Sequence, residues 1–542
     1  MRKINAFWLK VIAIGMVLSL LLGAVGCATQ QPATGVLRVA LNDFGTDQLD
    51  PILQSSMSRS TSACLFDHII TLSPDDGSLA PGIAERWEAG TDGQSWTFYL
   101  REGVYWQDDW GEVTADDVKF SLERVMSPES KSPYAGSFGE AIKNIEAVDK
   151  YTVRIDTNGT VIDLPVMLSF AQGGEGLVVP KRYIEEKGLD EFRSNPIGSG
   201  PWKLVRHVPG SLLEFEAVED PAHYKNHYRV MPAFQRLEIR LVPEEATRLA
   251  MLQTGEIDVA LISGTTMEEA KQAGLQVVSI PFVGQDRLLI WETYRTPDLP
   301  TANLKVRQAL NLAINRDEIV QYLLAGEGSA EVLPDRVFPF SVDIDMDYWK
   351  DYGKKTYTYD PERAKELLAE AGYADGFDLK MWSFAQVGRP WQTQMGEVLA
   401  GYFSEIGVRT QLVPVDWGTF RPYWSSSPHS PELDGAVAIM NSNARAVIPP
   451  SMYLNFHSEG RIGLLHSPEV DMAITGALSE PDAAKRREFL HTALQLSADS
   501  MVSIPISYNS QLVGVSDNVK WSPVPGQKDM GLSYERATHA TK

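Results

Sequence analysis

The segment that follows residue 91 alternates apolar and polar positions with a period of two. Asp92 and Gly93 form a pair that favours the positive φ angles of a tight hairpin turn. After this pair, Trp96, Phe98 and Leu100 occupy every second position, so their side chains share one face of an extended chain. The pattern predicts a β-hairpin with one buried face.

The next segment changes to the helical period. Val118, Leu122 and Val125 recur at helical spacing, which places them on one side of an α-helix. Thr114 precedes them, and the carboxylate of Asp117 can accept from N–H groups that the first helical turn leaves unpaired. A helix is therefore predicted to begin directly after Thr114.

Strand and helix patterns alternate along most of the remaining chain. Short apolar runs predict strands at Val36–Leu41, Leu212–Ala217, Leu237–Leu241, Val408–Val413 and Ala436–Met440. Helical spacing predicts helices at Glu244–Thr254 and Gln394–Gly407, two more within residues 304–326, and one that opens at Asp360-Pro361. Val277–Glu292 and Ser503–Val515 are long and extended. This alternation predicts an α/β fold.

The first 27 residues have the pattern of an export signal. Three basic residues precede a short apolar run, which ends in small residues before Cys27. A small residue directly before a cysteine resembles the bacterial lipobox, in which the thiol is acylated and becomes the mature N-terminus. We predict a lipoprotein signal peptide over residues 1–27, lipidation of Cys27 and a polar tether over residues 28–35. An ordinary signal peptide with an incidental cysteine is the alternative.

Length and charge limit the classes of protein that remain. A chain of 542 residues is too long for one hydrophobic core, so two or three domains are expected. Its 71 acidic residues outnumber its 49 basic residues, and the net charge of −22 argues against a nucleic-acid partner. If Cys27 is acylated, Cys64 is the only thiol left, and no intramolecular disulfide can form.

Motifs of common enzymes were not found in the sequence. It contains no G-x-S-x-G, H-E-x-x-H, C-x-x-C or P-loop pattern, so we predict no catalytic residue, no cofactor and no metal site. His223 and His227 could meet on one helical face as metal ligands. Pro221, Tyr224 and Asn226 around them indicate an irregular surface loop instead, and metal binding there stays open.

Several longer motifs occur in a characteristic order. A-E-x-W, D-G, W-T-F-x-L-R-x-G-V and T-A-x-D-V-x-x-S-x-x-R follow one another within residues 84–124. LKVRQALNLAINRDEIV begins at Leu304, and YDPERAKELLAEAGY begins at Tyr359. Together they resemble the peptide/nickel type (family 5) of extracytoplasmic solute-binding proteins of bacterial ABC importers, which includes dipeptide- and oligopeptide-binding proteins. The resemblance extends over residues 36–520.

The resemblance implies a fold and a division of the chain. The fold is the two-lobed periplasmic-binding-protein fold, with mixed sheets flanked by helices and an extra subdomain on the first lobe. Lobe I would comprise residues 36–75, 195–285 and 505–542, the extra subdomain residues 76–194, and lobe II residues 286–504. The two long extended segments would then cross between the lobes beside a ligand cleft.

The resemblance also implies a ligand site. Arg389-Pro390-Trp391 resembles the R-P-Y/W turn of dipeptide-binding relatives, whose arginine pairs with the ligand carboxylate through a planar fork of donors. A structural salt bridge is the alternative for Arg389. Trp417 matches an aromatic residue that packs against the ligand in relatives, and packing in the core is its alternative. Asn443 stands where those relatives carry an aspartate for the α-amino group of the ligand, and Arg445 follows it.

Asn443 departs from the pattern of dipeptide-binding relatives. An asparagine can accept a hydrogen bond but supplies no charge, and Arg445 nearby disfavours an ammonium group. We therefore expect that a ligand without a free α-amino group binds at least as well as an ordinary dipeptide. Glu292 and Asp416 are the acidic residues that could replace the missing aspartate.

The expected function follows from the resemblance. We expect an exported, lipid-anchored receptor, in the periplasm or on the outer face of the cytoplasmic membrane. It would capture a peptide-like or other carboxylate-bearing solute and deliver it, as a monomer, to the membrane subunits of an ABC importer. A carrier of sugars or metal chelates is the alternative within the class, and a secreted hydrolase is the alternative from another class.

Overall fold

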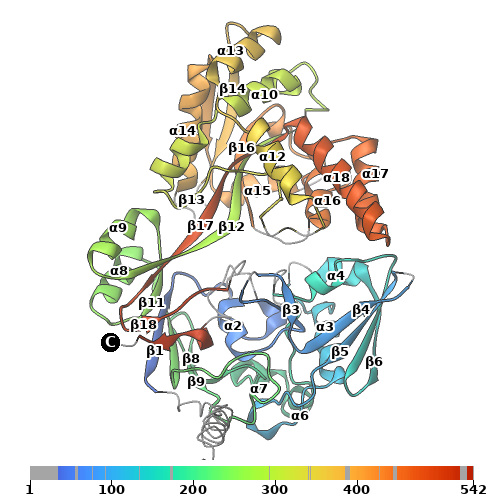
Figure 1. Cartoon of the computed structure of the whole chain (residues 1–542), viewed down its shortest axis with the longest axis vertical. Helices are drawn as coiled ribbons and strands as arrows, with labels where there is room; N and C mark the ends of the chain where they lie inside the picture. The colour runs from blue at the N-terminus through green and yellow to red at the C-terminus, as the bar shows by residue number, and fades with distance from the viewer. Residues whose placement is uncertain are drawn as a thin grey trace, which may run out of the picture.

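The chain forms two lobes of mixed α/β structure that are joined by two long strands, β12 (Gln276–Ile290) and β17 (Ser503–Val515) (Figure 1). The computed structural model describes residues 34–54, 59–75, 77–91, 93–132, 135–170, 175–291, 293–339, 341, 343–384, 391–425, 428–443, 448–524 and 534–540. We call the lower lobe in Figure 1 lobe I and the upper lobe lobe II.

One eleven-stranded sheet passes through both lobes. Its strands follow the order β15, β14, β16, β12, β17, β11, β1, β10, β9 and β8, and β13 pairs with β17 beside this path. Their bounds are Val408–Pro414 (β15), Phe377–Ser383 (β14), Val437–Asn443 (β16), Val259–Ile262 (β11), Val36–Leu41 (β1), Arg236–Leu241 (β10), Leu212–Ala217 (β9), Trp202–Val208 (β8) and Gly328–Ser329 (β13). The strands predicted from apolar runs are confirmed to within a few residues.

The crossing strands β12 and β17 pair antiparallel, with an irregularity in the middle of β12. The register shifts between Ile280 and Gly284, and Phe282 between them has a φ of 56°. A positive φ is uncommon for a bulky side chain, and an interrupted register bends a strand. The strands therefore bend at Phe282, between the part that pairs in lobe I and the part that pairs in lobe II.

Lobe I buries apolar side chains on both faces of its sheet. β1 lies between β10 and β11 and is parallel to both. Leu37 and Val39 of β1 are fully buried in the largest core of this lobe, and Ala40 points into a smaller core under α8 (Glu245–Gln253) and α9 (Gly264–Gln272). Burial on both faces explains why β1 is mainly apolar, with Arg38 as its one charged residue.

The extra subdomain contains the predicted hairpin and helix. Its sheet has the order β4 (Ala84–Ala89), β5 (Ser95–Leu100), β7 (Thr152–Thr157) and β6 (Ile142–Asp149), and α3 (Ala115–Val125) packs beside it. The backbone N–H of Thr114 donates to the Asp117 carboxylate at 2.9 Å, which confirms the predicted start of the helix. Phe98 and Leu100 are buried as expected, whereas Trp96 is half-buried.

Lobe I and its subdomain also hold shorter elements. The strands are β2 (Ile70–Leu72) with β3 (Leu79–Pro81), and β18 (Val519–Lys520) with β19 (Thr538–His539). The helices are α2 (Arg59–Leu65), α4 (Ala135–Ala141), α5 (Leu164–Met167), α6 (Lys181–Lys187) and α7 (Leu189–Ser194).

Helices surround the lobe II part of the sheet. They are α10 (Leu304–Leu312), α11 (Arg316–Glu318), α12 (Met346–Thr356), α13 (Pro361–Glu370), α14 (Trp391–Glu405), α15 (Trp417–Ser425), α16 (Pro449–Phe456), α17 (Pro468–Ser479) and α18 (Ala483–Ser500). Two predictions need correction: the second helix within 304–326 continues from α11 as a π-helical turn over Ile319–Leu323, and α14 begins at Trp391 instead of Gln394. Within the described ranges, no helix has the length and apolar character needed to cross a membrane.

Candidate functional site: a carboxylate on the crossing strands

A buried polar cluster surrounds Asp286 of β12. This residue is 1 % exposed, and its two carboxylate oxygens accept four hydrogen bonds. The side-chain amide of Asn441 donates to Oδ1 at 2.8 Å. The indole of Trp391, the amide of Asn509 and the hydroxyl of Ser507 donate to Oδ2 at 3.2, 3.0 and 3.5 Å. The cluster therefore ties α14, β16 and both crossing strands to one carboxylate.

Among the described residues, the donors that surround Asp286 are all uncharged. In the described part of the chain, no lysine, arginine or histidine forms an ion pair with this carboxylate. Buried carboxylates are normally paired with a cation or satisfied by several hydrogen bonds. Asp286 is satisfied by hydrogen bonds. Three donors reach Oδ2 and one reaches Oδ1, so Asp286 orients the groups that bond to it.

The neighbours of Asp286 along β12 point to the other face of the sheet. The amide of Gln285 donates to the carbonyl oxygen of Leu333 at 2.9 Å, and the guanidinium of Arg287 forms an ion pair with Asp335. The hydroxyl of Ser503, on β17, donates to the same Asp335 carboxylate at 2.8 Å. Successive residues of a strand face opposite sides, so β12 carries a carboxylate with uncharged donors on one face and an ion pair on the other.

The structure places some of the predicted site residues on the Asp286 face and leaves others undescribed. Trp391 is the first residue of α14, and its indole reaches Asp286. Asn443 is the last residue of β16 and lies opposite Gly284 on β12. Trp391 and the end of β16 are thus brought to the same stretch of β12. Trp417 is the first residue of α15.

Other predicted positions lie outside the described residues. They are Cys27, Arg389, Arg445 and Glu292. Asp416, the second acidic candidate, is described and precedes α15. Its carboxylate accepts from the hydroxyl and backbone N–H of Thr419 at 2.6 and 3.0 Å, and these bonds lower the pKa of Asp416. It therefore serves as a cap for the helix that begins at Trp417.

Gly284 permits the close approach of β16 to β12. A Cβ at this position would lie 2.7 Å from Oδ1 of Asn441 and 3.0 Å from the carbonyl oxygen of Ser442. Any side chain here would displace the amide that Asp286 holds. The glycine is thus part of the polar cluster although it contributes no side chain.

Sequence reasoning missed Asp286, although the sequence does carry a signal for it. Gln285, Asp286 and Arg287 interrupt a strand that is otherwise apolar, and all three are buried. A polar triplet within a strand that crosses between lobes is unexpected on packing grounds, because buried polar groups need partners. Such an interruption indicates a site or a structural network.

Replacing Asp286 by Asn should disrupt the cluster. The new NH2 group would face donors that now point at a carboxylate oxygen, so we expect a loss of about 1–3 kcal/mol in the free energy of unfolding. One of the 13 tryptophan indole N–H resonances should also shift, because the Trp391 indole loses its acceptor. Urea unfolding and 15N-labelled NMR spectra measure these effects, with the exposed Asp347→Asn as the control. Unchanged indole resonances would contradict this assignment.

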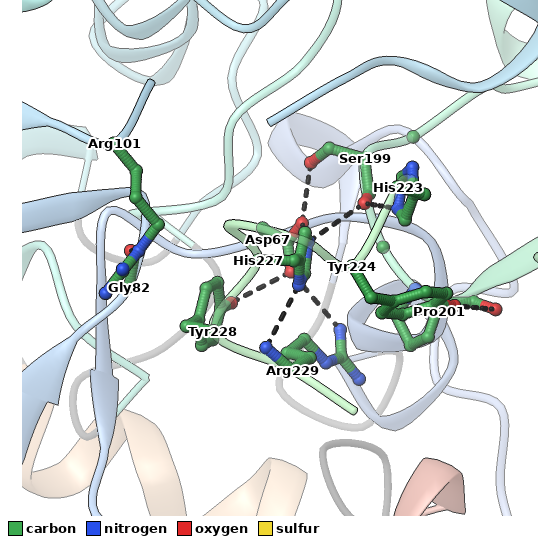
Figure 2. A network of polar contacts seen from close by, with 12 residues as sticks. Asp67, Gly82, Arg101, Ser199, Pro201, His223, Tyr224, His227, Tyr228 and Arg229 are labelled. Atoms are coloured by element: carbon green, nitrogen blue, oxygen red, sulfur yellow. Dashed lines mark hydrogen bonds and ion pairs between the residues drawn. The ribbon is translucent and has the colours of Figure 1, made fainter. Parts of the chain in front are cut away.

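A second buried polar network lies in lobe I and includes His223 and His227 (Figure 2). Nε2 of His227 lies 2.8 Å from the Asp67 carboxylate, and its Nδ1 accepts from the backbone N–H of Arg229 at 3.0 Å. His223 Nε2 lies 2.8 Å from the carbonyl oxygen of Ser199. The segment is irregular and exposes Pro221 and Asn226, as expected of a surface loop, but both imidazoles are buried in this network. Among the described residues no cluster of metal-ligating side chains is found.

Asp67 is the centre of the lobe I network. Ser199 and Tyr228 donate hydroxyl hydrogen bonds to its carboxylate at 2.7 and 2.9 Å, and the Arg229 guanidinium lies 3.5 Å away (Figure 2). Burial by itself would raise the pKa of Asp67, but attraction to His227 and Arg229 together with these hydrogen bonds holds it well below its usual range. Arg229 also pairs with Glu535 at 2.9 Å, so the network attaches the C-terminal segment to lobe I.

Two α/β lobes joined by two strands of one sheet form the architecture of a periplasmic solute-binding protein. The profile described as "Bacterial extracellular solute-binding proteins, family 5 Middle" matches residues 78–461. The chain belongs to this family. It is therefore an extracytoplasmic solute-binding protein of ABC transporters and not an enzyme, which removes the hydrolase alternative.

Individual relatives are distant in sequence but similar in length and fold. Heme-binding protein A of Haemophilus influenzae is 25% identical over 503 residues, which cover 86% of each chain. The dipeptide-binding protein of Escherichia coli is 27% identical over 405 residues, which cover 69% of this chain and 70% of that protein. The crystal structure of the ABC transporter substrate-binding protein CtaP from Listeria monocytogenes superposes with a TM-score of 0.77 at 19% identity, covering 94% of this chain and all of CtaP.

Proposed function

We propose that this protein is a lipid-anchored receptor that binds a carboxylate-bearing solute between its lobes and delivers it to an ABC importer. The observation that carries the proposal is the Asp286 cluster, which fixes Trp391 and the strand that ends at Asn443 on one face of the crossing strands. Arg389 precedes Trp391 by two residues in the sequence, so a guanidinium suited to a carboxylate would join the same face. In this proposal Trp417 and Arg445 complete the site.

The division of the chain is part of the same proposal. Lobe I comprises residues 36–75, 195–285 and 505–542, the extra subdomain residues 76–194, and lobe II residues 286–504. The names of the relatives support a small organic ligand, because one relative is named as a dipeptide-binding protein and another as a heme-binding protein. The protein acts as a monomer that docks on the membrane subunits of the importer.

The ligand test compares matched dipeptides with free and N-acetylated amino groups. Asn443 supplies no charge for an ammonium group, whose burial without a full partner would cost several kcal/mol. The acetylated form should therefore bind at least as tightly as the free form in calorimetric titrations. The bound solute should be recovered chemically unchanged. Strong binding of the free form alone would show that another acidic residue fills the role, and the proposed site would be wrong.

The lipid anchor has a separate test. Because an apolar run and a small residue precede Cys27, replacing Cys27 by Ser should release the protein from the membrane fraction or leave its precursor unprocessed. Cell fractionation and the mass of the mature N-terminus measure this. Cys64→Ser is the matched control, since this buried thiol lies within the fold and has no part in anchoring. A Cys27 variant that fractionates and matures like the wild type would exclude lipidation.

A further inference from the structure

A cavity of about 660 Å³ lies beside the crossing strands, and its lining comes entirely from residues between Phe282 and Tyr359. Leu333 lines it, and the carbonyl oxygen of Leu333 accepts from Gln285, which faces away from Asp286. The cavity is thus on the sheet face opposite the proposed solute site, and lobe II forms it with β12. Its volume is in the range of sites that hold small organic molecules. We call it the hinge cavity.

The hinge cavity contacts β12 at the bend. Phe282, the residue with positive φ at the register shift, contributes its ring to the lining. The same ring packs edge-on against Tyr508 of β17, with 5.3 Å between the ring centres. A molecule in the cavity would therefore contact Phe282 of β12, whose ring packs on Tyr508 of β17. A change in the bend of the two strands would change the shape of the cavity.

Another part of the lining comes from α12 and the segment after β13. Val332, Leu333 and Pro339 give this part an apolar surface. A Cβ at Gly353 would collide with the carbonyl oxygen of Val332, so the glycine lets α12 pack directly on that segment. This part of the lining is therefore fixed by close backbone contact and can hold an apolar group.

Cationic side chains stand at the rim without acidic partners. Lys350 and Lys354 lie one turn apart on α12 and line the cavity, and neither forms an ion pair in the described part of the chain. Lys355 on the same helix is different, because it donates to Asp351 at 2.6 Å. Two unpaired ammonium groups near each other favour an anion between them.

Arg316 adds a third cation at the base of the cavity. Its guanidinium is buried and bonds to neutral acceptors: the carbonyl oxygen of Pro505 at 2.9 and 3.0 Å, and the side-chain oxygen of Asn311 at 2.7 Å. Burial lowers the pKa of Arg316 to about 10, so it remains charged at neutral pH. Asp317 and Glu331 are the acidic lining residues, which leaves a local excess of positive charge in a chain with a net charge of −22.

We propose that the hinge cavity binds a small organic anion with an apolar body, and that its occupancy changes the bend of the crossing strands. The apolar body would rest on Phe282 and Leu333, and the acidic group would lie between Lys350 and Lys354. This site is independent of the solute site on the opposite face, so it would let a second molecule modulate lobe closure by contacts with the hinge.

The test uses 4-phenylbutyrate and its uncharged analogue 4-phenylbutanamide with the full chain. Calorimetric titration should show binding of the carboxylate that weakens with salt, and little binding of the amide. Lys350→Gln/Lys354→Gln should weaken the carboxylate about three- to tenfold. Lys355→Gln/Lys365→Gln, which removes two paired surface lysines, is the matched control and should leave binding unchanged. Ala330→Trp, which fills the cavity, should abolish binding.

Amide hydrogen exchange tests the link to the hinge. Saturation with 4-phenylbutyrate should slow exchange in peptides that cover 276–290 and 503–515, and the Ala330→Trp variant should show no such response. Equal binding of acid and amide, or equal loss in the two double lysine variants, would overturn the site. Binding without protection of the crossing strands would overturn its role at the hinge. None of these three outcomes bears on the solute site, which these variants do not alter.

Discussion

Replacing Asp67 by Asn is expected to lower the free energy of unfolding by about 3–5 kcal/mol near pH 7, the range found when one partner of a buried ion pair is removed. The carboxylate is fully buried, and it pairs with Arg229 and His227. An asparagine leaves the buried guanidinium with Glu535 as its acidic partner. Denaturant unfolding measures the difference, with the exposed Asp347→Asn as a control that should change stability by less than about 0.5 kcal/mol.

The effect of this substitution should depend on pH in a defined direction. The pKa of Asp67 is held below its ordinary value in the folded protein, so the carboxylate contributes stability above the unfolded pKa of about 3.9. That contribution is lost as the pH falls from there toward the folded pKa. The difference between wild type and Asp67→Asn should therefore shrink as the pH falls below about 4. A difference that grows on acidification would contradict the depressed pKa.

Replacing Arg389 by Ala is expected to weaken a carboxylate ligand by about 2–5 kcal/mol, because one partner of a buried charge pair would be missing. The proposed role predicts a split between ligands: a dipeptide amide, which lacks the carboxylate, should lose little affinity. The affinity of Arg389→Lys for the carboxylate ligand should fall between those of the wild type and Arg389→Ala, since a lysine keeps the charge but loses the planar fork of donors. Calorimetric titration of the wild type and the two variants measures these affinities. An equal loss for the acid and the amide would show that Arg389 is structural.

The fold was predictable from sequence where local signals and long-range packing agree. The Thr114 and Asp117 cap and the mainly apolar sequence of β1 are such cases, because the residues that favour the local element also make its contacts in the fold. The π-helical turn at Ile319–Leu323 was not predictable, because the apolar spacing there fits an α-helix as well. The order of the sheet, in which β17 lies between β12 and β11, also depends on contacts across hundreds of residues that no local pattern contains.

The candidate site was predictable only in part. Trp391 was found through its motif, and the structure adds the acceptor that orients its indole. Asp286 was missed because the sequence was searched for residues that match a ligand motif, whereas this carboxylate acts on other side chains. His223 and His227 were assigned to the surface because their polar neighbours suggested a loop. The segment is irregular and partly exposed, as expected, but its two imidazoles point inward and bond to Asp67 and Ser199.

The position of β17 within the sheet has a consequence for export. The chain reaches this strand only at residues 503–515, yet β17 fills the place between β12 and β11 and contributes to the cores of both lobes. Until that segment has emerged from the secretion channel, the sheet lacks a central member and neither lobe can complete its core. The topology thus makes the completion of both lobes depend on a segment close to the C-terminus.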